Sequence, residues 1–211
     1  PKLDRKGLKS ALRKRGIARF KQADLDALTP AQKAKAVIIV QDCFTTHYDT
    51  NVLLAHVDLL QTLGYRVFVP PYRANGKAMH VKGFLKKFDY LAQQNDIVLG
   101  KIAQSGVAMV GIEASVTLTY RQEYAQRLHD RPDYRVHLFH EWLSTEITEG
   151  RVTPPKMDNG VNIDAPASLF PHCTEKTSIP DVGVKWQNIF AAFGLTLTTE
   201  KTGCCGMAGV Y

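Results

Sequence analysis

The sequence predicts an α/β fold with two similar βαβ halves, each containing a parallel sheet, preceded by a basic helical arm. Short apolar runs rich in β-branched residues alternate with longer amphipathic segments, as strands and helices do in βαβ units. A segment rich in Pro, Gly and Asn interrupts this alternation between residues 150 and 164, and a shorter series of strand and helix signals follows it. We therefore divide the chain into a basic arm and linker (1–30), a first half (31–150), a second linker (151–165) and a second half (166–211).

The amino-terminal arm carries almost all of the positive charge. Residues 1–21 hold nine Lys or Arg side chains and one acid, whereas the rest of the chain holds 18 bases and 19 acids. A basic arm can bind nucleic acid or an anionic surface, but such a run more often forms the solvated face of a helix. Leu8, Leu12, Ile17 and Phe20 form a rough apolar stripe. We expect the arm to dock on a neighbouring segment, and we expect no nucleic-acid partner.

The first half alternates predicted strands and helices. Thr29 and Pro30 provide an N-cap and a first helical residue for a short helix. Predicted strands and helices then cover 36–40 (strand), 51–63 (helix), 65–69 (strand), 78–104 (helix), 107–112 (strand) and a helix ending near 129. Residues 134–138 form a fourth strand or lead into a helix around Trp142. A polar loop, residues 41–49, follows the first strand at the sheet edge where α/β proteins bind ligands.

The second half repeats this Rossmann-like order over a shorter length. Residues 167–171 form a predicted strand that leads to His172 and Cys173, and residues 195–198 form a strand that leads to Cys204. A predicted amphipathic helix connects the two strands. Because ligands of open α/β sheets bind at the carboxyl ends of the strands, we expect Cys173 and Cys204 to lie close together.

Three of the four cysteines form one pattern, Cys-x30-Cys-Cys-Gly, made by Cys173, Cys204, Cys205 and Gly206. Adjacent cysteines are poorly placed to pair with each other, because disulfide geometry separates the two Cα atoms. Their thiolates can instead diverge onto a metal, while the flanking glycines let backbone amides approach the sulfurs. We predict a metal site with these three thiols as ligands, Gly206 in its loop and His172 as a candidate fourth ligand. Ligand chemistry alone does not distinguish an iron–sulfur cluster from a zinc ion at this site. The alternative to a metal site is that the three cysteines are buried apolar side chains.

Several classes of function are disfavoured by the sequence. No apolar run approaches 18 residues and no signal peptide is visible, so we expect no membrane span. The chain begins with Pro1, which we interpret as the start of a fragment. Four cysteines with this clustering favour a reduced compartment. We find no Cys-x-x-Cys pair for a thiol–disulfide enzyme and assign no catalytic residue, and we do not count Cys43 as a ligand because its loop lacks partner cysteines.

The chain resembles the cysteine-rich CCG domain over about residues 30–211. The resemblance rests on His172-Cys173-Thr174-Glu175-Lys176 and, most specifically, on Gly203-Cys204-Cys205-Gly206-Met207-Ala208-Gly209. The second run is similar to FAD-linked D-2-hydroxyacid dehydrogenases, large proteins that join an FAD-binding oxidase domain, a ferredoxin-like domain and a carboxyl-terminal CCG pair. Three further stretches are similar to a branch that includes D-2-hydroxyglutarate and D-lactate dehydrogenases: Gln41-Asp42-x-Phe44-Thr45, Asn75-Gly76-Lys77 and Arg121-Gln122-Glu123-Tyr124.

This resemblance implies an electron-transfer function. The three thiols would bind an iron–sulfur cluster of the 4Fe-4S type, which passes electrons from FAD in another domain toward an acceptor that the sequence does not identify. The implied partners are the FAD-binding and ferredoxin-like domains of the same polypeptide. The implied location is cytoplasmic, with peripheral association at the inner face of the membrane left open. The isolated fragment would be inactive on hydroxyacids. The alternative function is a zinc-stabilised structural or interaction module with no redox role.

The first half departs from the family pattern. Pro71-Tyr72-Arg73-Ala74-Asn75-Gly76 occupies the region of its Cys-Cys-Gly run, and Glu113-Ala114-Ser115-Val116 stands where relatives carry Glu-Pro-Ser-Cys. We therefore expect the first half to have lost its cluster. The family motif also continues to a further cysteine, which a sequence ending at Tyr211 does not include. We expect the second half to be truncated.

Overall fold

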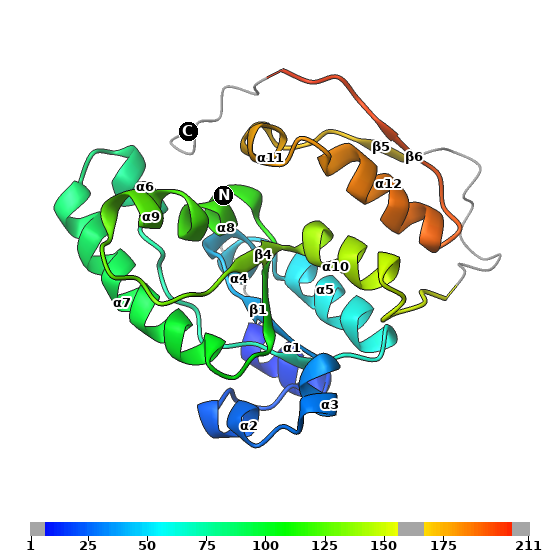
Figure 1. Ribbon diagram of the computed structural model, residues 1–211, viewed down its shortest axis with the longest axis horizontal. Helices are drawn as coiled ribbons and strands as arrows, with labels where there is room; N and C mark the ends of the chain where they lie inside the picture. The colour runs from blue at the N-terminus through cyan, green and yellow to red at the C-terminus, as the bar shows by residue number, and fades with distance from the viewer. Residues whose placement is uncertain (1–6, 156–166, 204–211) are drawn as a thin grey trace. The chain divides into compact units, whose positions relative to one another are not determined.

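The structure, a computed structural model, describes residues 7–155 and 167–203. The described residues form two compact units, one up to residue 137 and the other from residue 138 onward. Figure 1 shows their helices and strands in chain order. Helices combine with parallel strands in both units, so the predicted α/β fold class with parallel sheets is confirmed.

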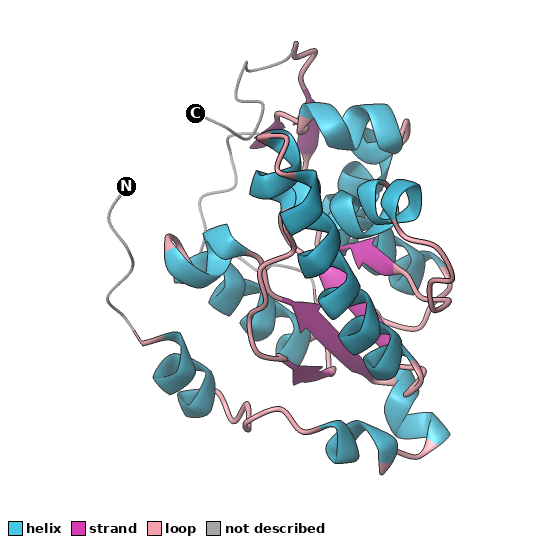
Figure 2. Ribbon diagram, turned by 90° about the vertical axis from the view of Figure 1, so that its left-hand side faces the viewer, coloured by secondary structure: helices cyan, strands magenta, loops and turns pink. Residues whose placement is uncertain are grey.

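The first unit is built on a sheet with the strand order β2-β1-β3-β4, drawn in magenta among the helices of Figure 2. Its strands are β1 (Ala36–Val40), β2 (Arg66–Phe68), β3 (Ala108–Gly111) and β4 (Val136–Leu138). β1 pairs in parallel with both β2 and β3, so that Ile38 lies opposite Phe68 on one side and Met109 on the other. The loops after β1 and β3 therefore flank the topological switch point, where open α/β sheets bind ligands.

Nine helices surround these strands in the described part of the first unit. They are α1 (Leu8–Lys14), α2 (Gln22–Asp26), α3 (Pro30–Ala34), α4 (Cys43–His47), α5 (Thr50–Thr62), α6 (Lys77–Val81), α7 (Leu85–Ala103), α8 (Ala114–Arg121) and α9 (Glu123–Arg127). The long helices α5 and α7 connect β1 to β2 and β2 to β3, as the crossovers of parallel strands require.

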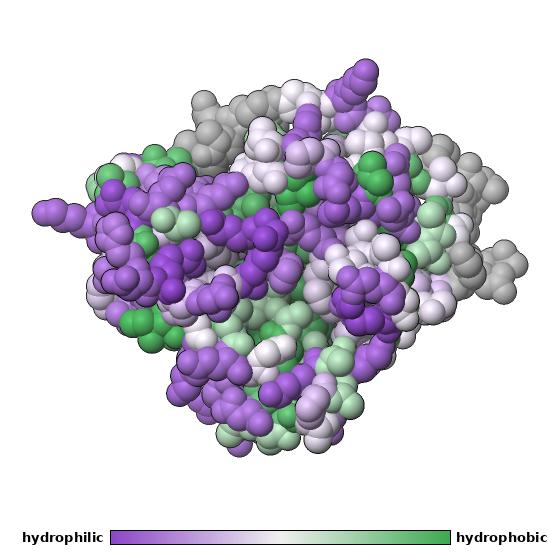
Figure 3. All heavy atoms as spheres, in the orientation of Figure 1, coloured by the Kyte–Doolittle hydropathy of each residue, from purple (hydrophilic) through white to green (hydrophobic). Residues whose placement is uncertain are grey.

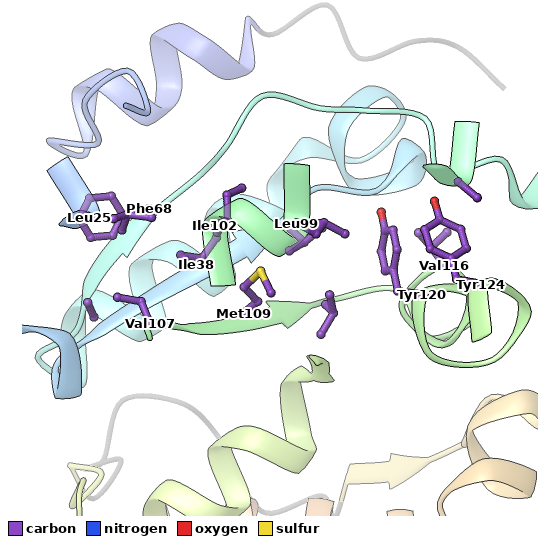
Figure 4. Close-up of a cluster of buried hydrophobic side chains, with 14 of the residues drawn as sticks. Leu25, Ile38, Phe68, Leu99, Ile102, Val107, Met109, Val116, Tyr120 and Tyr124 are labelled. Atoms are coloured by element: carbon purple, nitrogen blue, oxygen red, sulfur yellow. The ribbon is translucent and has the colours of Figure 1, made fainter. Parts of the chain in front are cut away.

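The central strand β1 is buried along its whole length. Because side chains alternate along a strand, Ile38 and Val40 face one side of the sheet while Val37 and Ile39 face the other. The Ile38 side belongs to a core cluster that includes Phe88, Leu99 and Ile102 of α7, Met109 of β3, and Tyr120 and Tyr124, and Figure 4 labels much of this cluster. Burial on both faces explains why β1 is continuously apolar in the sequence.

Two helix boundaries differ from the sequence-based expectation for local chemical reasons. Asp42 accepts hydrogen bonds from the amides of Phe44 and Thr45, both at 2.8 Å, so α4 begins inside the predicted polar loop. Gly83, with φ of +76°, follows the end of α6 and divides the predicted helical region 78–104 into α6 and α7.

The amino-terminal arm docks on α5 of its own unit. Leu12 and Ile17 are buried. The guanidinium of Arg15 donates to both carboxylate oxygens of Asp58, at 2.6 and 2.9 Å, and Gln61 donates to the Arg15 carbonyl oxygen at 2.9 Å. The arm is therefore held by apolar burial and by a two-point ion pair, as its apolar stripe predicts.

The second unit contains a two-stranded parallel sheet. Its described elements are α10 (Phe139–Thr148), β5 (Ala167–Leu169), α11 (Cys173–Ser178), α12 (Val182–Ala192) and β6 (Leu197–Thr199). Because α10 packs against α12, it belongs to this unit, although the sequence-based division placed residues 139–148 in the first half. The order strand, short helix, longer helix, strand is the same as in β1-α4-α5-β2. This correspondence relates the two units as a repeat.

The surface carries mostly hydrophilic side chains on the face shown in Figure 3, with small apolar patches between them. Large apolar side chains that are exposed include Phe84, Tyr90, Ile97, Phe170 and Val184. Within residues 7–155 and 167–203, no helix has the length and apolar character needed to cross a bilayer.

Candidate metal centre

Cys173 follows the carboxyl end of β5 as the first residue of α11, and its thiol is partly buried. The preceding residue, His172, caps this helix. The Thr174 amide donates to Nδ1 of His172 at 3.2 Å, and the His172 amide donates to Oε2 of Glu175 at 3.3 Å. This reciprocal cap fixes the backbone around the thiol. Because Nδ1 accepts this hydrogen bond, a neutral His172 ring carries its proton on Nε2, and the ring would have to give up the cap before it could bind a metal.

The segment that leads to the other two thiols is attached to the same helix. Beyond the paired strands, the Glu200 amide donates to the carbonyl oxygen of Leu169 at 2.9 Å. Further along, the ammonium of Lys176 donates to the carbonyl oxygen of Thr202 and lies 3.3 Å from its Oγ1. Thr202 stands two residues before Cys204. The chain therefore approaches the Cys-Cys-Gly run beside the helix that begins at Cys173.

Cys204, Cys205 and Gly206 lie outside the described residues, so their role as ligands stays a prediction. No group of three or more His, Cys, Asp or Glu side chains that could hold a metal ion occurs in the part of the chain that the structure describes. That part contains His172 and Cys173 but neither member of the adjacent cysteine pair.

A buried contact between His140 and Glu175 anchors α11 within its unit. Nδ1 of His140 in α10 lies 3.0 Å from Oε1 of Glu175, and the two side chains are only 2% and 11% exposed. The His140 ring stacks on Trp186 of α12, with ring centroids 5.3 Å apart. Glu175 thus joins the cap of α11 to α10. Sequence analysis quoted this glutamate as part of a motif and gave it no role, although its place three residues after His172 was a capping-box signal.

The first unit places a cysteine at the equivalent position. Cys43 is the first residue of α4 after β1, as Cys173 is the first residue of α11 after β5. Burial, and after it the charge of Asp42, raises the pKa of the Cys43 thiol. Cys204 follows the end of β6 by five residues, and Arg73 follows the end of β2 by the same number. A protonated thiol and an arginine are poor ligands for a metal cation.

Two motifs of the family resemblance meet in the first unit. Lys77 forms an ion pair with Glu123, and the Tyr124 hydroxyl donates to the carbonyl oxygen of Asn75 at 2.8 Å. Gly76 has φ of +86°, and a Cβ atom there would lie 2.8 Å from the ring of Phe88, so this turn requires glycine. Sequence analysis did not predict the contact, because the ion-paired residues are 46 positions apart and no local pattern links them.

Curated relatives match most of the chain. D-2-hydroxyglutarate dehydrogenase from Haemophilus influenzae is 41% identical over 191 residues, and those from Pseudomonas putida and Escherichia coli are 42% and 38% identical over 187 and 188 residues. Each match covers 89% of this chain. The chain is homologous to one part of the D-2-hydroxyglutarate dehydrogenases.

This homology confirms the resemblance drawn from the sequence motifs. The relatives are named as enzymes, and the chain spans about 18% of the length of each. No family model matches the chain, and no solved structure matches it.

Proposed function

We propose that this chain is the iron–sulfur electron-transfer part of a flavin-linked D-2-hydroxyacid dehydrogenase, with Cys173, Cys204 and Cys205 holding a cluster of the 4Fe-4S type. The observation that carries the proposal is the contact between Lys176 and Thr202, which attaches the segment leading to Cys204 to the helix that begins at Cys173. The names of the relatives support the dehydrogenase class and suggest D-2-hydroxyglutarate as the substrate. Thiolates from a glycine-rich run suit iron–sulfur ligation.

The described residues near the proposed cluster have distinct tasks. When bound, the cluster accepts and passes on single electrons. Cys173 supplies one thiolate from a partly buried position, which limits the access of water. The buried contact of His140 with Glu175 orients the helix that carries this thiol. Lys176 fixes the approach of the chain to the other thiols and places a positive charge on that side of α11.

The rest of the proposal concerns the larger protein. Hydride leaves the hydroxyacid for FAD in another domain of the same polypeptide, and a ferredoxin-like domain is the second partner within that polypeptide. We place the protein in the cytoplasm, where thiols stay reduced, with peripheral association at the inner face of the membrane as an alternative. The support for this arrangement is the homology to one segment of dehydrogenases several times longer than the chain.

Metal analysis tests this function. The chain, and the longest natural protein that contains it, are reconstituted without oxygen in the presence of ferrous iron and sulfide, beside a Cys204→Ser/Cys205→Ser variant. We expect iron and sulfide in near-equal amounts, a visible absorption band and an EPR signal on reduction, all lost in the variant. Equal iron and sulfide content in the variant would contradict the proposed ligand set.

The second candidate function is a zinc-stabilised structural or interaction module. The observation that favours it is the position of His172 directly before Cys173, where it could supply a nitrogen ligand if its ring gave up the cap of α11. In the same experiment this function predicts one zinc ion per chain and no iron–sulfur spectrum. A His172→Gln variant tests the candidate fourth ligand, because it should weaken zinc binding by a Cys₃His site.

A further inference from the structure

The first unit contains a cavity of about 200 Å³ that the electron-transfer function does not use. The loops after β1 and β2 form one side of it and the carboxyl-terminal half of α7 forms another. Its walls are mainly apolar and include Phe20 from the arm, Pro70, Val98 and Leu99. A volume of this size fits a molecule of roughly ten non-hydrogen atoms rather than a nucleotide.

Two polar side chains in the walls are already engaged in the fold. Gln41 donates to the carbonyl oxygen of Pro70 at 2.6 Å and accepts a hydrogen bond from Thr46 at 2.9 Å. Asn95 donates to the carbonyl oxygen of Ala74 at 2.8 Å. These amides hold the two loops in place, and we assign them no ligand.

The hydroxyl of Tyr120 is different. The residue is only 3% exposed and lines the cavity, and its hydroxyl has no hydrogen-bond partner among the described residues. The hydroxyl of the neighbouring Tyr124, in contrast, has a partner within the fold, because it donates to the carbonyl oxygen of Asn75. Figure 4 shows the two rings side by side with their hydroxyls on the same side of the cluster. Burial raises the pKa of Tyr120, so the group stays a neutral donor near pH 7. A hydroxyl on the wall of the cavity can donate to an acceptor on a bound molecule.

Arg73 provides a charge at the exposed edge of the same cavity. It is exposed and lines the cavity, and it forms no ion pair within the described ranges. Three other arginines of this unit pair with carboxylates: Arg15 with Asp58, Arg127 with Asp89 and Arg131 with Asp96. A guanidinium at the exposed edge of an apolar cavity can pair with an anionic group on a molecule that fills that cavity.

We propose that this cavity binds a small monocarboxylate whose apolar body lies between α7 and the loop after β2. Its carboxylate pairs with Arg73 at the exposed edge, and a hydrogen-bond acceptor at its other end meets the hydroxyl of Tyr120 inside. The site belongs to the first unit alone and does not depend on a bound metal. It gives the half without a cysteine pair a ligand-binding role of its own.

Matched ligands test both ends of the proposed molecule. The probe is 4-acetylbenzoate, titrated by calorimetry into the 211-residue chain. Its partners are 4-isopropylbenzoate, which has the same shape but no acceptor, and 4-acetylbenzyl alcohol, which has no charge. We expect 4-acetylbenzoate to bind about tenfold more tightly than either, which corresponds to about 1.4 kcal/mol for each polar contact.

Two variants assign these preferences to residues. Tyr120→Phe should remove the preference for acetyl over isopropyl and leave the preference for the acid, whereas Arg73→Gln should do the reverse. The controls Tyr90→Phe and Arg13→Gln, at exposed positions, should bind as the unchanged protein does. The proposal is overturned if 4-acetylbenzoate does not bind at millimolar concentration, or if it binds no better than its partners. Preferences that survive in both variants would also overturn it. The ligand comparison decides the matter in the unchanged protein even if Tyr120→Phe does not fold.

Discussion

Lys176 of α11 donates a hydrogen bond to the backbone carbonyl oxygen of Thr202, which stands two residues before Cys204. This contact ties together two segments that are 26 positions apart in the chain. One begins a helix with Cys173, and the other leads to the Cys-Cys-Gly run. Lys176 thus takes part in building the proposed metal site, although the spacing of the cysteines gives no sign of its role.

Replacing this lysine should loosen the approach to the adjacent thiols. In Lys176→Met the carbonyl of Thr202 loses a charged donor, and hydrogen bonds to charged groups contribute about 1.5–3 kcal/mol. We expect reconstituted protein to lose iron to a chelator several times faster than the unchanged protein. Lys185→Met is the control, because Lys185 pairs with Asp181 on the exposed surface of α12. Equal rates of iron loss in the two variants would contradict this role.

Breaking the buried pair of His140 and Glu175 should destabilise the second unit. Glu175→Ala removes both the partner of His140 and the acceptor of the His172 amide. Leaving a buried hydrogen-bonding group without its partner costs about 1–3 kcal/mol, and we expect a loss near the upper end because the helix cap is lost as well. Urea unfolding followed by Trp186 fluorescence measures the change. A loss below about 1 kcal/mol would show that the pair does not anchor α11.

The ion pair of Lys77 with Glu123 should contribute to the stability of the first unit. In Glu123→Gln the lysine loses its charge partner in a partly buried place, where the side chains are 23% and 13% exposed. Oε2 of Glu123 is buried and has no hydrogen-bond partner among the described residues, so the carboxylate itself is costly to bury. We expect a net loss of about 1–2 kcal/mol in urea unfolding. Asp89→Asn, which removes the exposed partner of Arg127, should change little. A Glu123→Gln protein as stable as the original would contradict the prediction.

The thiol of Cys43 should react slowly with alkylating reagents. Burial, Asp42 and Glu113 raise its pKa, and only the thiolate is nucleophilic. Because of the raised pKa, the Cys43 thiol stays protonated to a higher pH in the folded protein than in the unfolded chain. The resulting contribution to stability is complete below the unfolded pKa and is lost as pH rises through the folded value.

Mass spectrometry of iodoacetamide-treated protein follows Cys43 directly. We expect its alkylation rate to rise at a higher pH than that of an exposed thiol, because only the thiolate reacts. Asp42→Ser keeps a capping side chain on α4 but removes the charge, so it should shift the profile to lower pH. An unchanged or upward-shifted profile in this variant would refute the electrostatic part of the explanation.

Much of the fold could be predicted from the sequence because its signals are local. The β-branched run of β1 identifies a strand, and Thr29 starts α3 through the predicted cap, with a reciprocal bond to Gln32. Gly64 and Gly194 follow α5 and α12 in the left-handed region. The start of α4 was not predicted, because a residue such as Asp42 is common both in polar loops and at helix N-caps. Only the fold shows which of the two it forms.

The candidate site was predictable to a smaller degree. Strand order and cysteine spacing suffice to place Cys173 at the end of β5, where the structure has it. The contacts of Lys176, Glu175 and Lys77 depend on tertiary packing between distant segments, which spacing does not record. The equivalence of Cys43 and Cys173 becomes visible only when α4 and α11 are seen to begin at the two cysteines.

The most direct test of the central claim compares these two equivalent cysteines. Iron and sulfide content and the EPR spectrum are measured after anaerobic reconstitution of the unchanged protein, Cys173→Ser and Cys43→Ser. We predict that Cys173→Ser loses most of the iron and the EPR signal, while Cys43→Ser keeps both. Full retention of iron and signal in Cys173→Ser, or an equal loss in both variants, would contradict the assignment of the cluster to the second unit.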